Sequence, residues 1–168
     1  MNARVLVAYA TKYGATAEIA EKIGAVLREA GLGVDVLPVA RVGDLSPYRA
    51  VVLGSAVYIF RWRKEAVAFL KANEKALAER PVWLFSSGPT GTGDAVELTQ
   101  GRRLPDELKP IAERIKPRDI AVFHGLANAQ RLNFLEKFML KNVKVPLGDF
   151  RDWASITAWA ASIAAALK

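Results

Sequence analysis

Short apolar runs alternate with amphipathic segments along this chain. Apolar runs without polar interruption predict strands over residues 5–9, 50–55 and 82–86, and further strands are predicted over 34–39 and 119–124. Apolar positions recur at helical spacing after Thr16, over 62–77, over 109–116, over 131–143 and after Asp152, which is placed to cap the final helix. Strands that alternate with helices predict a parallel sheet covered by helices on both faces.

Three of the predicted strands end in segments rich in glycine, serine or threonine. These segments are 11–16, 55–61 and 86–93, and the last of them opens a long loop over 88–105. Ligands of open α/β sheets bind beyond the carboxyl ends of the strands, where the strand order reverses. Loops of this length in a compact domain are usually lids or binding segments. The agreement among the three segments indicates a ligand site at that edge.

The first of these segments has the chemistry of an anion site. Thr11 and Thr16 each offer a hydroxyl donor, and Gly14 lets the backbone approach a ligand closely. The first N–H groups of the following helix have no partner within the helix, and the helix dipole places partial positive charge there. The alternative is an ordinary turn whose threonines cap a helix.

Composition narrows the class of protein. The 168 residues predict one domain over 1–168, and 52% hydrophobic with 24% charged residues is typical of a globular chain. No cysteine is present and His124 is the single histidine, so we expect no disulfide, no cysteine nucleophile and no metal site. A strand at the start and no apolar run of bilayer length lead us to expect a cytoplasmic protein.

The net charge of +7 favours anionic partners. Basic clusters with interleaved aromatic residues are too short to favour nucleic acid, which we do not expect as a partner. Two basic segments, 61–64 and 131–144, are candidates for attracting an anionic substrate, and the second is also a candidate for peripheral membrane contact. For both, the alternative is a solvated helix face.

The first segment resembles the phosphate loop of the flavodoxins through Tyr9, Thr11, Gly14 and Thr16. The resemblance implies an α/β three-layer sandwich with a five-stranded parallel sheet in the order 2-1-3-4-5, and FMN as the cofactor. It implies that the phosphate is held by Thr11, Lys12, Tyr13, Gly14, Ala15 and Thr16. It also implies that the flavin ring lies between two further groups, which are Ser55, Ala56, Val57, Tyr58 and Ile59 on one side and Ser86, Ser87, Gly88, Pro89, Thr90 and Gly91 on the other.

Two aromatic residues, Tyr58 and Trp62, are candidates for covering a face of the ring, with simple packing as the alternative for each. The segment after residue 86 lacks the tyrosine that many flavodoxins stack on the ring, so one face is open to a substrate. The spacing of Gly88, Gly91 and Gly93 is not that of a dinucleotide fingerprint.

Residues 123–159 resemble the flavodoxin-domain subfamily that contains menaquinone-dependent protoporphyrinogen dehydrogenase. This resemblance implies an FMN-dependent oxidoreductase that acts on an anionic small molecule such as a porphyrinogen, with a quinone as acceptor. The alternative functions are an electron-transfer protein that docks redox partners and a scaffold without cofactor. No catalytic acid or base stands out, because His124 is either a proton donor or a hydrogen-bonded residue at a strand end.

Overall fold

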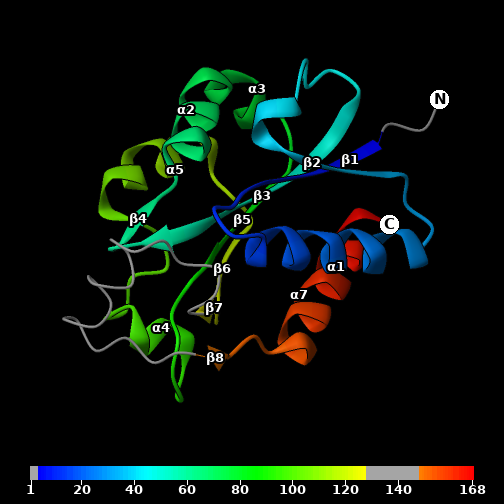
Figure 1. The fold of residues 1–168 in the computed structure, drawn as a ribbon. Helices are drawn as coiled ribbons and strands as arrows, with labels where there is room; N and C mark the ends of the chain where they lie inside the picture. The colour runs from blue at the N-terminus through cyan, green and yellow to red at the C-terminus, as the bar shows by residue number, and fades with distance from the viewer. Residues whose placement is uncertain (1–3, 128–147) are drawn as a thin grey trace.

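A computed structural model describes residues 4–127 and 148–168 (Figure 1). The elements in these residues are, in order, β1 (Arg4–Ala10), α1 (Ala15–Glu29), β2 (Val34–Pro38), the 3-10 turn η1 (Val39–Arg41), β3 (Tyr48–Tyr58), β4 (Arg61–Trp62), α2 (Lys64–Ala72), α3 (Glu74–Ala78), β5 (Val82–Ser87), α4 (Ala95–Leu98), the 3-10 turn η2 (Asp106–Leu108), α5 (Lys109–Ile115), β6 (Asp119–Phe123), β7 (Leu126–Ala127), β8 (Gly148–Asp149) and α7 (Trp153–Leu167).

The central sheet has the order β2-β1-β3-β5-β6, and all of these pairs are parallel. This order confirms the predicted 2-1-3-4-5 arrangement, because β4 is a short antiparallel addition to β3 and does not enter the parallel series. At the centre of the sheet Val7 of β1 lies opposite Val36 of β2 and Val52 of β3. Strands β7 and β8 form a separate antiparallel pair.

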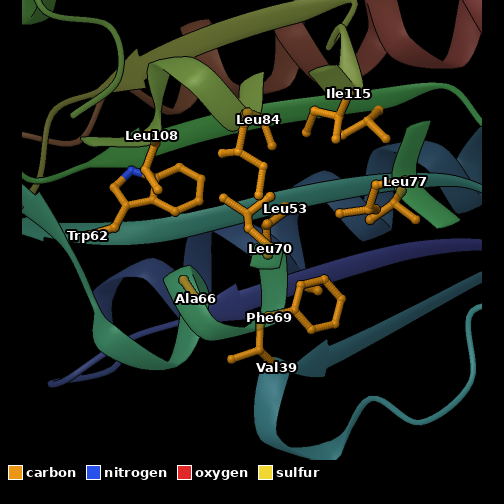
Figure 2. Close-up of a cluster of buried hydrophobic side chains, with 14 of the residues drawn as sticks. Val39, Leu53, Trp62, Ala66, Phe69, Leu70, Leu77, Leu84, Leu108 and Ile115 are labelled. Carbon is orange, nitrogen blue, oxygen red and sulfur yellow. The ribbon is translucent and has the colours of Figure 1, made fainter. Parts of the chain in front are cut away.

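Helices cover both faces of the sheet, because successive strand residues point to opposite sides. Leu6 and Ala8 of β1 join a buried cluster beneath α2, α3 and α5, part of which is drawn in Figure 2. Val5 and Val7 join a second cluster beneath α1 and α7, which pack side by side (Figure 1). The strands predicted over 5–9, 50–55 and 82–86 form apolar runs without polar interruption because both of their faces are buried.

Aromatic rings fill the second cluster near the last strand. Phe85, Phe123 and Trp159 pack against one another with ring centroids 5.5–6.0 Å apart. Gly54 makes room for one of these rings, since a Cβ atom there would lie 2.0 Å from Cζ of Phe85. The central strands therefore depend on a small residue at this position.

Some predicted boundaries were wrong. The helix predicted over 62–77 is two helices that break at Asn73, whose side-chain amide donates to the carbonyl of Phe69 at 2.9 Å. The loop predicted over 88–105 contains the short helix α4, which Asp94 caps through the N–H groups of Val96 and Glu97. Asp152 caps α7 as predicted. The helix predicted over 131–143 lies outside the described residues.

None of the helices in the described part of the chain combines the length and the apolar character needed to cross a bilayer.

Candidate functional site at the carboxyl edge of the sheet

The carboxyl ends of β1, β3 and β5 bring the three predicted segments together. Thr16 Oγ1, at the start of α1, lies 3.5 Å from Ser87 Oγ at the end of β5. Lys12 Nζ lies 5.4 Å from the ring centroid of Tyr13 and 5.7 Å from that of Tyr58, so it links the first segment to the end of β3. Residues far apart in the sequence thus form one surface around the start of α1.

The turn between β1 and α1 is built around Gly14. Its φ of 93° lies in the left-handed region that favours glycine, and no atom lies within 4 Å of where a Cβ would stand. Its N–H donates to Thr11 Oγ1 at 3.0 Å. Thr11 therefore holds the turn itself and does not cap the helix.

Helix α1 begins at Ala15 without a side-chain cap. The alternative interpretation, that threonines merely cap this helix, is therefore wrong: Thr16 is buried and its hydroxyl faces Ser87. Helix-start N–H groups, an adjacent hydroxyl and the ammonium group of Lys12 are the donors that a phosphate requires. The residues present fit a phosphate group.

The segment after β3 differs from the predicted loop. Strand β3 continues through Ser55 and Val57 to Tyr58, and a two-residue turn at Ile59 and Phe60 leads directly into β4. Both turn residues have positive φ, 50° and 59°, as a tight hairpin turn requires. Neither residue is typical of such a turn, so the turn could not be predicted from the local sequence.

Trp62 is part of this hairpin and is buried, with 4% of its surface exposed. Its indole N–H donates to Ser86 Oγ at 2.8 Å, which ties the hairpin to β5. The interpretation of Trp62 as a cover for a flavin face is therefore wrong. Tyr58 remains available for that role, because it is 37% exposed beside Lys12.

Close backbone approach explains two glycines at the end of β5 and β6. A Cβ atom on Gly88 would lie 2.8 Å from the carbonyl oxygen of Val57, and one on Gly125 would lie 2.8 Å from Cα of Gly88. The Gly125 N–H donates to the carbonyl of Pro89 at 2.9 Å. Half-buried Thr90 and Gly91 follow, so 86–91 lies beside the end of β3 and the hairpin at this edge of the sheet.

His124 has the structural role that was the alternative to a proton donor. Its Nε2 donates to the carbonyl oxygen of Gly93 at 2.8 Å, which holds the loop after β5 against the end of β6. The carbonyl oxygen can only accept, so this contact fixes the proton on Nε2.

The basic residues predicted to attract an anionic substrate lie in two segments, 61–64 and 131–144. Arg61 is exposed on the hairpin, whereas Arg63 pairs with Glu65 at 3.2 Å and its backbone N–H donates to Ser55 Oγ at 3.0 Å. The segment 131–144 lies outside the described residues.

One residue beside the site was not predicted. Arg151 packs against the first turn of α1, where its Nη1 lies 3.4 Å from the carbonyl oxygen of Ala15. A charged residue in a predicted loop is expected to be exposed to solvent, but the side chain of Arg151 is only 6% exposed. No local sequence pattern predicts this burial.

Comparison with known proteins defines the class. A family model described as "Flavodoxin domain" matches residues 6–152, so the chain belongs to the flavodoxin-domain family. A flavodoxin from the domain Archaea covers 98% of this chain and 98% of its own at 14% identity, with a TM-score of 0.64. The rubredoxin oxygen:oxidoreductase of Desulfovibrio gigas covers 99% of this chain and 36% of its own at 11% identity, with a TM-score of 0.63. At these identities the two structures show the shared fold.

Among curated proteins, the chain is similar to the protoporphyrinogen IX dehydrogenase [quinone] of Escherichia coli K12. The two are 23% identical over 172 residues, which cover 96% of this chain and 94% of the relative. Membership of the flavodoxin-domain family implies a flavin protein of redox function.

Proposed function

We propose that this chain is an FMN-dependent oxidoreductase that oxidises an anionic small molecule, of the porphyrinogen class, and passes the electrons to a quinone. The observation that carries the proposal is the uncapped start of α1 beside the Thr11–Gly14 turn, enclosed by the ends of β3 and β5. The full-length similarity to a quinone-dependent protoporphyrinogen dehydrogenase supports the substrate and acceptor classes.

In this proposal the first segment holds the phosphate. The N–H groups at the start of α1, the hydroxyls of Thr11 and Thr16, and Lys12 donate to phosphate oxygens, while Tyr13 and Ala15 complete the turn. Gly14 keeps the backbone close to the anion, because no side chain stands between them. The turn is held before any ligand arrives by the Gly14 to Thr11 hydrogen bond.

The two walls hold the flavin ring. Residues 55–59 offer the half-buried backbone of Ala56 and Val57 and the exposed ring of Tyr58, and residues 86–91 offer hydroxyl and N–H groups. The Trp62 to Ser86 hydrogen bond ties the hairpin at the end of residues 55–59 to the start of residues 86–91. A bound FMN supplies the redox chemistry, and the protein supplies position and charge.

Charge around the site favours an enzyme over an electron shuttle. Lys12 and exposed Arg61 lie in the site segments of a chain whose net charge is +7. A cation about 6 Å from the ring stabilises negative charge gained on reduction by roughly 2–3 kcal/mol at an effective dielectric of about 20. The same cations attract the carboxylates of a substrate.

The first test is flavin uptake by the purified protein. We expect FMN bound at one per chain and, with menaquinone as acceptor, oxidation of protoporphyrinogen. Replacement of Arg61 and Arg63 by glutamine should raise the KM for the porphyrinogen with a smaller effect on kcat. The matched control removes two exposed cations near the amino ends of the strands, Lys75 and Lys116, and should leave the KM unchanged.

Three results would contradict the proposal. If the wild-type protein takes up no FMN, the proposed cofactor is wrong. If the FMN-loaded protein does not oxidise porphyrinogens, the proposed substrate class is wrong. Flavin reduction in two well-separated one-electron steps, the second at very low potential, would instead identify an electron-transfer protein that docks redox partners.

A further inference from the structure

The side chain of Arg151 packs against the start of helix α1. That side chain is 6% exposed, and Nη1 lies 3.4 Å from the carbonyl oxygen of Ala15 and 3.5 Å from Oε2 of Glu18. Burial of a charge is costly unless the charge is paired. An arginine in this position therefore has a defined structural purpose.

The guanidinium group is held on three sides. Nε and Nη2 each donate to one oxygen of the Asp149 carboxylate at 2.9 Å, a bidentate arrangement that only arginine can form. The guanidinium carbon lies 4.8 Å from the ring centroid of Trp153, the first residue of α7. The hydrogen bonds with Asp149, above all, raise the pKa of Arg151, so it stays charged.

This contact joins two distant parts of the chain at the predicted phosphate turn. Ala15 is the first residue of α1, Asp149 is the last residue of β8, and Arg151 lies in the segment between β8 and α7. The Phe150 N–H donates to the carbonyl of Gly125 at 3.1 Å, which fixes this segment to the end of β6. Arg151 thereby links the rigid end of the sheet to the first turn of α1.

The electrostatic consequence concerns a phosphate at this turn. Asp149 and Glu18 are two carboxylates close to the start of α1, and a phosphate monoester carries nearly two negative charges at neutral pH. The positive charge of Arg151 makes the potential beside these carboxylates less negative, so their repulsion of a phosphate opposes the helix dipole's attraction less. Arg151 thus offsets part of the negative charge of Asp149 and Glu18 beside the helix start.

We propose that Arg151 is a positioning residue for the phosphate of FMN, which fixes Ala15 and offsets part of the negative charge of Asp149 and Glu18 beside the helix start. This inference rests on the proposed function. It concerns the phosphate alone, so it predicts an effect on FMN that riboflavin, which has the same ring and no phosphate, does not share.

The test compares FMN and riboflavin binding to the flavin-depleted full chain by quenching of flavin fluorescence. Wild type is expected to prefer FMN. Arg151→Gln should reduce the FMN affinity by about tenfold or more and change the riboflavin affinity less than about twofold. The loss should shrink as salt is raised, because added ions screen the exposed carboxylates.

Three further variants keep the result interpretable. Arg151→Lys retains the charge and should keep most of the FMN preference. Arg151→Gln combined with Asp149→Asn should show an FMN preference at least about threefold higher than that of Arg151→Gln alone. Arg118→Gln is the matched control, because Arg118 also lies over a tryptophan ring, 5.5 Å from the centroid of Trp83, but directly precedes β6 at the amino ends of the strands. It should bind both flavins as wild type does.

The outcomes separate the two proposals. If wild type prefers FMN and a folded Arg151→Gln keeps that preference, the role of Arg151 is overturned and the proposed function stands. If Arg151→Gln does not fold, the double variant Arg151→Gln with Asp149→Asn is compared with Asp149→Asn alone: a lower FMN preference in the double variant supports the role, and an equal preference overturns it. A wild type that binds neither flavin, or both equally, overturns the proposed function and this inference together.

Discussion

Two turns at the same edge of the sheet contain residues with positive φ, but different types of residue adopt it. The turn before α1 places its positive φ at Gly14, with open space where a Cβ would stand. The hairpin turn between β3 and β4 places two positive φ values at Ile59 and Phe60. A residue with a Cβ in the left-handed region costs about 1–2 kcal/mol, and a β-branched residue such as Ile59 is a true outlier there.

Contacts around the hairpin explain how such a turn is held. Val57 pairs with Trp62 across β3 and β4, and the Trp62 indole is hydrogen-bonded to Ser86. The Arg102 guanidinium lies 5.3 Å from the ring centroid of Phe60. One turn is thus built from a residue suited to its backbone, whereas the other is imposed by tertiary contacts. Such strain concentrates at functional sites, which agrees with the proposed place of 55–59 beside a flavin.

The largest effect is expected for Gly14→Val. A β-branched residue at a φ of 93° should lower the free energy of unfolding by about 2 kcal/mol and move the helix-start N–H groups, so FMN affinity should fall by about tenfold or more. Urea unfolding and flavin titration measure the two effects. Gly31→Val is the matched control, because Gly31 has a φ of 94° and open space at the far end of α1. Equal loss of FMN affinity in both variants would contradict a binding role for Gly14.

A smaller effect is expected when the hairpin is detached from β5. Trp62→Phe removes the indole N–H and leaves the buried Ser86 hydroxyl without its 2.8 Å donor, which should lower the free energy of unfolding by about 1–2 kcal/mol. Because the smaller ring also changes packing, the hydrogen bond itself is measured by a double-mutant cycle with Ser86→Ala. A coupling energy of about 1 kcal/mol is expected, and additive effects would show that the bond does not hold the hairpin.

The parallel sheet could be predicted from the sequence because the signals for its strands lie within short stretches of the chain. Continuous apolar runs such as 50–55 can be buried on both faces only in a covered parallel sheet, and small polar residues at the ends of such runs mark the ligand edge. The turn at Thr11 and Gly14 could be predicted for the same reason, since turn chemistry depends on the residues in the turn itself.

The hairpin and the arginine contact could not be predicted in that way. Trp62 stands four positions before Ala66, a spacing that also fits a helix, and Ile59 and Phe60 carry no turn signal. The burial of Arg151 results from a contact with a residue 136 positions away. Both features arise from tertiary contacts that override local preference.

A stabilising change should result from giving the hairpin a turn suited to it. The pair Ile59→Asn and Phe60→Gly creates the preferred dipeptide for two positive φ values and should raise the free energy of unfolding by about 1 kcal/mol after the loss of the Arg102 contact. Riboflavin affinity should fall, because Ile59 belongs to the proposed ring wall. Ile59→Val keeps the strain and should bring no gain. An unchanged affinity in the stabilised variant would show that the strained residues serve no binding purpose.

The smallest effect is expected at the opposite edge, where the polar groups of three strands pair with one another. Asp35 of β2 lies 2.7 Å from Nη2 of Arg4 in β1, and the Tyr48 hydroxyl of β3 donates to it at 2.8 Å. The hydrogen bond from Arg4, above all, holds the pKa of Asp35 below its usual value. Since a third of the Asp35 side chain is exposed, solvent screens the pair, and Asp35→Asn should lower the free energy of unfolding by only about 0.5–1 kcal/mol at pH 7.

The pH dependence identifies the cause of that effect. A carboxyl whose folded-state pKa is lowered stabilises the protein above the pKa of the unfolded chain, near 4, and this stabilisation is lost as the pH falls through the folded-state value. Wild type and Asp35→Asn should therefore differ most at pH 6–7 and converge toward pH 3 in urea unfolding. A difference that stays constant over this range would assign the effect to packing. FMN affinity should match wild type throughout the neutral range, because this edge lies at the opposite end of the strands from the proposed site, and a loss of affinity here would mean that the two edges are energetically coupled.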